Sequence, residues 1–140
     1  MEITMIDKKY FLPIFEERIN EFVLQLDRMP EIIAKGFKIS SEAWMRRSDF
    51  CMAYISCSRS PIEESIEFTL DISVTDDIFS IEAGIYLSDG TLIQDFGSVS
   101  ISGESLDEIK SNLEKYFDRL GSNELVSFSR FLLEQQNKSD

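Results

Sequence analysis

The chain has 140 residues, with 26 acidic and 14 basic side chains and a formal net charge of −12 at pH 7. A hydrophobic fraction of 43% and eleven phenylalanines argue against a disordered acidic chain and favour one globular domain with its own core. No apolar run approaches the roughly 18–20 residues that cross a membrane, and Met1–Asp7 lacks the basic residues of a secretory signal. We therefore expect a single cytoplasmic domain over residues 1–140, with a disordered polar tail at about 135–140.

The first predicted helix begins at Pro13, because proline suits the first turn of a helix. Its apolar residues recur at i, i+4, i+7, i+8 and i+11, the spacing of one buried stripe on an amphipathic helix. These residues are Phe15, Ile19, Phe22, Val23 and Leu26. Pro30 cannot continue the helix, so we expect the helix to end or kink near Arg28–Met29.

The segment after Pro30 has weaker signals. We expect a further helical turn or two through Glu31–Lys35, ending at Gly36, which can serve as a C-cap. Between Phe37 and Asp49 the periodicity is weak, and we predict a loop with one short helical turn around Trp44.

Four strands are predicted next, the first at Phe50–Ser58, which is apolar on both faces and should be well covered. The second, Ile66–Val74, alternates apolar and polar residues without a fault, which is typical of a half-buried strand. The third and fourth are Phe79–Leu87 and Leu92–Ile101.

Short turns should join the last three predicted strands. Asp89-Gly90 is a strong signal for a two-residue type I′ hairpin turn. Asp76-Asp77 can form a second two-residue turn, although it lacks glycine. The apolar phase of the fourth strand shifts at Gly97, which predicts a β-bulge there.

Two helices are predicted after the sheet. Ser105–Glu108 has the pattern of a capping box, and Gly121 should close the helix that follows. The buried stripe of that helix is predicted to be Leu106, Ile109, Leu113, Phe117 and Leu120. The last helix should start near Ser122 or Asn123 and bury Leu125, Phe128 and Leu132.

This order of elements predicts an α+β fold. We expect a four-stranded antiparallel meander sheet, with an N-terminal helix and two C-terminal helices packed on one face. Such a sheet leaves its other face open to solvent.

The negative charge is concentrated in one third of the chain. Residues 60–109 contain twelve acidic residues and no Lys or Arg, whereas the other ninety residues contain fourteen acids and fourteen bases. The whole net charge of −12 therefore belongs to the predicted strands and the residues that flank them.

The two predicted turns fix which residues share a face of the sheet, because directly opposed residues point the same way. They predict the pairs Leu87–Leu92, Tyr86–Ile93, Gly84–Asp95, Glu82–Gly97, Asp71–Glu82 and Glu67–Tyr86. The apolar face then holds Ile66, Phe68, Leu70, Ile72, Phe79, Ile81, Ile85, Leu87 and Phe96. The open face holds Glu67, Asp71, Glu82, Tyr86, Ile93 and Asp95.

This open face has two interpretations. One polar face is ordinary for an antiparallel sheet, so the acids can simply be solvated. Alternatively, the absence of bases over fifty residues indicates a recognition surface, since a surface selected only for solubility intersperses both signs. Tyr86 and Ile93 would then be its aromatic and apolar anchors.

Catalysis has no clear signature in the sequence. There is no histidine, which removes the usual general base and the commonest metal ligand. Asp71 and Glu82 are the closest predicted carboxylate pair, but an open sheet face offers no cleft to desolvate one of them. Asp76, Asp77 and Asp89 lack EF-hand spacing, and there is no phosphate-binding glycine loop. We expect no enzyme activity, no cofactor and no metal site.

The two cysteines indicate a reducing compartment. Cys51 and Cys57 lie in one predicted strand, about 20 Å apart, which is too far for a disulfide. They also lack the spacing and partners of a zinc site.

Nucleic acid is a disfavoured partner for so acidic a chain. A small basic region surrounds the loop before the sheet and consists of Lys35, Lys38, Arg46, Arg47 and Arg59. We favour local charge neutralisation over an anion site for this region, and a core lid over a ligand platform for Trp44 beside it.

Small size, acidic composition, no catalytic motif and an acidic exposed sheet face together resemble bacterial toxin-immunity proteins. These protect cells from contact-dependent growth inhibition and related polymorphic toxins. The resemblance implies a cytoplasmic inhibitor that binds a basic toxin domain, often a nuclease, and occludes its active site. Glu67, Asp71, Glu82 and Asp95 would then pair with Lys or Arg of the toxin around Tyr86.

Two other classes stay open. Secretion chaperones are also small, acidic α+β proteins, and they bind an unfolded effector segment as homodimers. They usually place a helix between strands, which the predicted order lacks. A carboxylate enzyme would lose activity in an Asp71→Asn or Glu82→Gln variant that still folds.

Overall fold

The structure is a computed structural model that describes residues 8–45, 51–59 and 63–135. Nine helices and strands lie in these ranges. In chain order they are α1 (Lys8–Asp27), α2 (Pro30–Ala34), β1 (Lys38–Met45), β2 (Cys51–Ser58), β3 (Ile66–Thr75), β4 (Ile78–Leu87), β5 (Leu92–Ile101), α3 (Leu106–Ser122) and α4 (Glu124–Glu134). None of the helices in the described ranges is long and apolar enough to cross a membrane.

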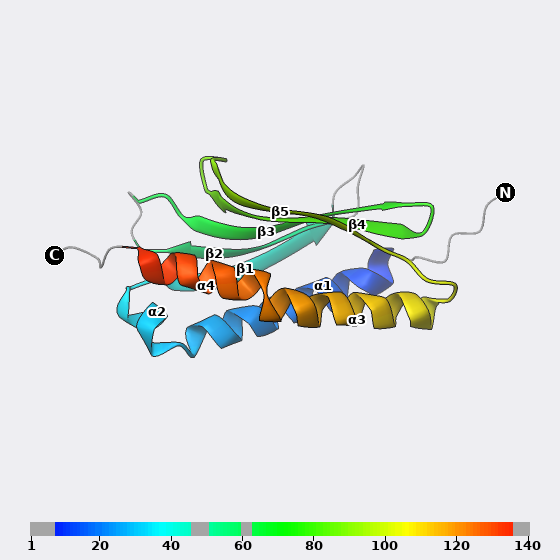
Figure 1. The fold of residues 1–140 in the computed structure, drawn as a ribbon, viewed down its shortest axis with the longest axis horizontal. Helices are drawn as coiled ribbons and strands as arrows, with labels where there is room; N and C mark the ends of the chain where they lie inside the picture. Colours follow the sequence, from blue (N-terminus) through cyan, green and yellow to red (C-terminus); the bar gives the residue numbers. More distant parts are fainter. Residues whose placement is uncertain (1–7, 46–50, 60–62, 136–140) are drawn as a thin grey trace.

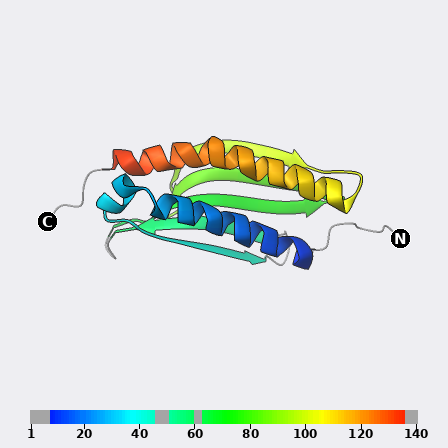
Figure 2. The ribbon, with the colours of Figure 1, turned by 90° about the horizontal axis from the view of Figure 1, so that it is seen from below.

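The five strands form one antiparallel sheet in the order β1-β2-β3-β4-β5. The helices lie together on one face of this sheet, as Figures 1 and 2 show, and leave its other face uncovered. The α+β fold, the antiparallel meander and the N-terminal and C-terminal helices are therefore as predicted, but the number of strands is wrong.

The strand that the sequence does not reveal is β1, where we expected a loop with a helical turn around Trp44. It pairs with β2 in a continuous register from Lys38 opposite Ser58 to Trp44 opposite Met52. Small and polar residues on its helix-facing side weaken the alternation, which explains why no strand was predicted. Tertiary pairing with a strongly apolar neighbour decides the structure of such a segment.

The N-terminal helix extends further than predicted, because α1 includes Lys8 and carries Pro13 inside it. Proline there removes one backbone hydrogen bond. The added turn buries Phe11, whose ring meets Phe79 edge-on at 5.2 Å between centroids. This burial offsets the lost hydrogen bond and explains why the helix does not begin at Pro13. The second helix, α2, ends as expected before Gly36, which has a positive φ of 85°.

The hairpin between β3 and β4 has the predicted register. Asp76 and Asp77 both adopt left-handed backbone, with φ of 52° and 58°, which is the geometry of a type I′ turn. Thr75 accordingly lies opposite Ile78, and Ile72 lies opposite Ile81.

The hairpin between β4 and β5 differs from the prediction. The N–H of Leu87 donates to the carbonyl of Thr91 (2.9 Å), and that of Gly90 donates to the carbonyl of Leu87 (2.9 Å). Gly90 alone in this loop has a positive φ, 94°, so the loop is the three-residue Ser88–Gly90 type with a glycine bulge.

The longer loop shifts the pairs nearest to it. Tyr86 lies opposite Leu92, not opposite Ile93, and Leu87 is not paired with Leu92. An irregularity beside Tyr86 restores the predicted register, so that Gly84 lies opposite Asp95. The predicted bulge at Gly97 is confirmed by a φ of 81° and by a register shift that puts Ser98, instead of Gly97, opposite Glu82.

The C-terminal helices follow the predicted pattern at most positions. The Ser105 hydroxyl accepts a hydrogen bond from the Glu108 N–H (3.1 Å), as a cap should, although the Glu108 carboxylate accepts from the N–H of Glu104. Leu106 is exposed, contrary to the prediction. Gly121 lies inside α3 instead of closing it. An added Cβ there would stand 3.1 Å from the ring of Phe22, so glycine leaves room for this ring.

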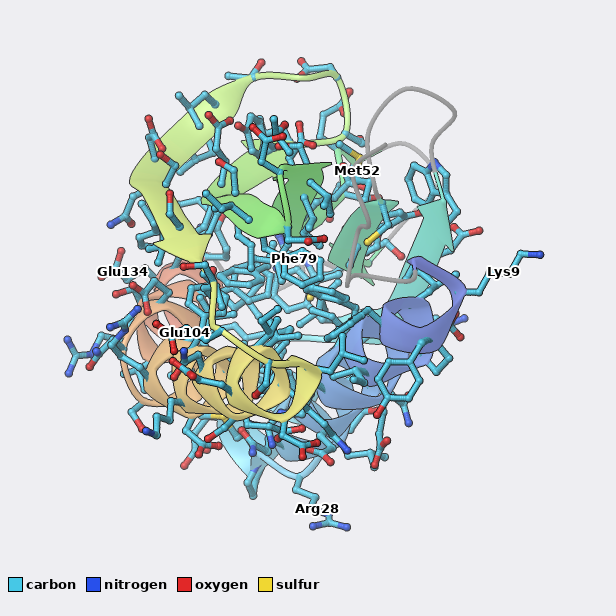
Figure 3. The ribbon with its side chains drawn as sticks, turned by 90° about the vertical axis from the view of Figure 1, so that its right-hand side faces the viewer. Lys9, Arg28, Met52, Phe79, Glu104 and Glu134 are labelled. Carbon is cyan, nitrogen blue, oxygen red and sulfur yellow. The ribbon has the colours of Figure 1, made fainter. Side chains whose placement is uncertain are left out.

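A chain of aromatic contacts joins the sheet to the helices. Phe79 meets both Phe11 and Phe15, and Phe15 meets Phe117 on α3 at 5.4 Å between centroids. Figure 3 shows Phe79 between the sheet and the helix layer, with Met52 on the opposite side of the sheet. The core thus lies on one side of the sheet, and its other side is free for polar residues.

We expect Phe79→Ala to lower the free energy of unfolding by about 3–5 kcal/mol, because it empties the centre of this aromatic cluster. Ile78→Ala on the same strand is the matched control, since Ile78 is 41% exposed, and should cost about 1 kcal/mol or less. Urea unfolding of both variants measures the difference. Equal losses would contradict the assignment of Phe79 to the core.

Candidate functional site

The open face of the sheet is built by every second residue of the five strands. The registers place Trp44, Met52, Asp71, Glu82 and Ser98 in one row across it. Among the described residues its acids are Glu42, Glu67, Asp71, Glu82 and Asp95, and its one base is Lys38 at the end of β1. The predicted concentration of acids on this face is therefore present.

A shallow depression of about 290 Å³ lies in the middle of this face, and we refer to it as the acidic hollow. Its lining consists of Met52, Glu67, Thr69, Asp71, Glu82, Tyr86, Leu87, Ser88 and Gly90. A smaller depression of about 170 Å³ adjoins it and shares Asp71 and Glu82. Four of the six predicted site residues thus come together: Glu67, Asp71, Glu82 and Tyr86.

The β3–β4 register brings the carboxylates of the hollow close to one another and to Tyr86. Asp71 lies directly opposite Glu82, and Glu67 lies directly opposite Tyr86. Partial burial raises the pKa of Glu67, since the charged carboxylate loses water there. A cationic group from a partner would relieve both the like-charge opposition and this loss of hydration.

Tyr86 is held in place by the glycine beside it on the same face. A Cβ at Gly84 would stand 2.9 Å from Cε2 of Tyr86 and 3.1 Å from the carbonyl oxygen of Gln94. The phenol ring therefore lies against the bare backbone of Gly84, which is itself buried. Only glycine leaves this space, so the ring forms a preorganised wall of the hollow.

An aromatic and acidic corner on β1 and β2 continues the open face beyond the hollow. The Tyr54 hydroxyl donates a 2.6 Å hydrogen bond to Glu42, and Trp44 meets the Tyr54 ring edge-on at 5.4 Å. Trp44 is 39% exposed, so it is not the core lid that we expected. Glu42 and Trp44 were missed because β1 was not predicted, and Tyr54 because its predicted strand was expected to be covered on both faces. The alternation of Lys38, Glu42 and Trp44 with Ile39 and Ala43 was the available signal.

The strand β2 is covered on one side only, contrary to the prediction. Its alternate residues Cys51 and Cys57 are fully buried under the helices, and neither forms a disulfide. Burial raises the pKa of the Cys57 thiol to about 12, which makes it unreactive. Met52, on the other side, lines the hollow.

The two remaining predicted site residues lie on β5, away from the hollow. Asp95 is on the open face opposite Gly84, and its carboxylate accepts a hydrogen bond from the N–H of Gly97 (2.8 Å). Ile93 falls at the irregularity beside Tyr86, where it faces no residue of β4, and is 38% exposed. The predicted Tyr86–Ile93 pair is therefore wrong.

Two bases of the basic region are already engaged by other parts of the described chain. Arg59 pairs with Glu63 (3.1 Å) and stacks over the ring of Phe37, while Lys35 donates to the carbonyl of Gln135. Arg46 and Arg47 lie outside the described residues. In the described part of the chain no group of three or more Cys, Asp or Glu side chains is arranged to hold a metal ion.

Compared with protein-family models, with curated proteins and with solved structures, the chain matches none of them. The function therefore has to be argued from the open face itself.

Replacing Glu82 by Gln should raise the free energy of unfolding at neutral pH by roughly 0.2–1 kcal/mol, because it removes a charge directly opposite Asp71. The gain should shrink in high salt, which screens the repulsion. Glu17→Gln, on the exposed surface of α1, is the matched control and should change little. A gain that is equal in both variants would show only the effect of net charge.

The hydrogen bond to Glu42 and burial raise the pKa of Tyr54 to about 12 from its ordinary value of 10.0. The hydroxyl therefore stabilises the fold fully below pH 10.0, and this contribution is lost as the pH rises through about 12. Glu42→Gln should move the Tyr54 titration back toward 10.0, as measured by tyrosinate absorbance against a Tyr54→Phe blank. Glu31→Gln should leave the titration unchanged, and an equal shift there would contradict the local cause.

Proposed function

We propose that this chain binds a basic, folded protein domain against the open face of its sheet and neutralises it, as toxin-immunity proteins do. The observation that carries the proposal is the acidic hollow, in which two β3 carboxylates and Glu82 line the same depression as the ring of Tyr86. A basic nuclease domain is the partner that such a surface suits best, because its own ligand is a polyanion.

Electrostatics support rapid capture of such a partner. The net charge of −12 attracts a cationic domain over a distance and orients the approach toward the acidic face. Within the hollow, Lys or Arg side chains of the partner would replace the like-charge contacts between Asp71 and Glu82. Because Asp71 and Glu82 already lie on the surface, binding needs no rearrangement of the sheet.

Apolar and aromatic groups support specificity at the centre of the surface. Tyr86 and Met52 line the hollow together, and hot spots of interfaces favour such anchors within a polar rim. The ring of Tyr86 is already packed on Gly84, so little side-chain freedom would be lost on binding.

The fold bears on the alternative functions as well. In the described ranges, five consecutive strands with no helix between them differ from the arrangement expected of a secretion chaperone. An enzyme using Asp71 and Glu82 would need to shield one carboxylate from water, and the two lie on an exposed sheet face. We propose no enzymatic activity.

A gene-neighbour and protection experiment tests the proposal. We expect the adjacent reading frame to encode a large secreted protein with a basic C-terminal domain. Expressed in the cytoplasm, that domain should arrest growth, and this chain should restore growth and bind the domain with an affinity that falls steeply with salt.

Matched variants locate the binding surface. Tyr86→Ala should weaken binding by about tenfold or more, as for a central anchor, whereas Tyr10→Ala, which removes a 51% exposed tyrosine, should not. A Glu67→Gln/Glu82→Gln variant should bind more weakly than Glu17→Gln/Glu31→Gln at equal net charge. Equal losses in the two double variants, or a captured partner that is not basic, would contradict the proposal.

A further inference from the structure

A second surface lies at the free edge of the sheet and does not involve the acidic hollow. β5 pairs with β4 on one side and with no other strand of the described chain on the other. In Figure 3 β5 forms the outer left edge of the sheet, with α3 beneath it. The space between this edge and α3 is a groove of about 310 Å³, which we call the edge groove.

The backbone of β5 offers unpaired hydrogen-bonding groups to this groove. The residues that flank a type I′ turn exchange hydrogen bonds, so Ile78 faces β3 and the next residue, Phe79, faces β5. The partners of Phe79 and Ile81 are Ile101 and Val99, whose N–H and C=O groups therefore point to β4. By alternation, the N–H and C=O groups of Ser100 point to the free edge.

An independent contact supports this orientation. The carbonyl of Ser102, two residues beyond Ser100, accepts a 2.7 Å hydrogen bond from the side-chain amide of Asn112 on α3. It therefore points away from β4 and toward the helix, as the alternation requires. Within the described residues, no such side-chain hydrogen bond to the backbone of Ser100 is present.

Two cations and no acid line the groove, although the protein is strongly acidic. Its lining consists of Val99, Ser100, Ile101, Ser102, Asn112, Lys115, Tyr116 and Arg119. The Arg119 guanidinium lies 5.8 Å from the centre of the Tyr116 ring. The acids Glu114 and Asp118 point to another side of α3, where they pair with Arg18 at 3.4 and 2.7 Å.

We propose that the edge groove binds an extended, acidic segment of another protein, which adds to β5 as a sixth strand. The segment hydrogen-bonds to the free backbone groups of Ser100, and its carboxylates meet Lys115 and Arg119. This is the β-augmentation mode, in which main-chain pairing provides affinity and side-chain pockets provide specificity. The site goes beyond the proposed function, because it lies at the free edge of the sheet instead of the open face and its charged side chains are basic.

The composition of β5 argues for a foreign segment over a second copy. From Phe96 to Ile101 the half of β5 that lines the groove has no acidic residue, so this half of a second copy would offer Lys115 and Arg119 no carboxylate. The irregularities at Ile93 and Gly97 protect the other half of this edge from pairing, as β-bulges do.

A peptide-binding experiment tests the edge groove. The probe is a short dye-labelled peptide of alternating threonine and glutamate, compared with its threonine–lysine counterpart by fluorescence anisotropy. We expect the glutamate peptide alone to bind and the backbone amide of Ser100 to gain protection from hydrogen exchange. Binding of both peptides equally, or of neither, would overturn the proposal.

Variants separate strand pairing from simple charge attraction. Ser100→Pro removes the outward N–H at an edge position that tolerates proline, and it should weaken binding about tenfold or more. Arg119→Glu should also weaken binding about tenfold or more. Arg28→Glu makes the same change of charge on the far side of the helix layer in Figure 3, and as the control it should leave binding unchanged.

Circular dichroism of each variant is the control for folding, and sedimentation is the measurement of the oligomeric state. Loss of binding in Arg119→Glu with full binding in Ser100→Pro would overturn strand addition and leave only an anion contact. A dimer that Ser100→Pro dissociates would also overturn the proposal, because the edge would then belong to a second copy.

Discussion

The structure depends on the type I′ turn at Asp76–Asp77, because this turn fixes the register of the two central strands. With Thr75 opposite Ile78, each apolar residue of β3 meets an apolar residue of β4 on the helix side. A slip of one residue would send the apolar set to the other face, since side chains alternate along a strand. Asp76 and Asp77 both adopt the left-handed backbone conformation, which is unfavourable for residues other than glycine. The packing of the two strands therefore holds the turn in this conformation.

The same register determines where the charge goes. Once the core residues face the helices, Glu67, Asp71 and Glu82 have only the open face to occupy, and two of them lie directly opposite each other. Like charges in this position are unfavourable, which a solvated surface does not require. The acidic hollow is thus a consequence of the core packing, and its charge pattern is what the proposed partner would complement.

The sequence predicts most reliably the elements whose signals are local. Ile66–Val74 alternates perfectly, and both the turn at Asp76–Asp77 and the bulge at Gly97 have the expected backbone. The strand β1 was missed because Ser41 and Ala43 are poor markers of a buried face, and its pairing with β2 is set by contacts far along the chain. Pro13 was misread because burial of Phe11 was invisible in the local pattern.

For the site, the pairs nearest the turn at Asp76–Asp77 were predictable, whereas those near Asp89-Gly90 were not. One additional loop residue moved Tyr86 away from Ile93, and the irregularity that compensates for it has no sequence signal. Trp44 and Glu42 entered the open face only with β1, and the edge groove required knowledge of where α3 lies. Errors in long-range placement thus affected the rim of the site more than its centre.

The most direct test of the register is the set of Hα–Hα nuclear Overhauser contacts between β3 and β4 in a labelled sample. Such contacts are strongest between residues that do not exchange hydrogen bonds, where Cα atoms are about 4.5 Å apart. The account predicts them between Ile72 and Ile81 and between Leu70 and Ala83. Contacts from Ile72 to Ser80 or to Glu82 would contradict it, because the acids would then no longer share the open face.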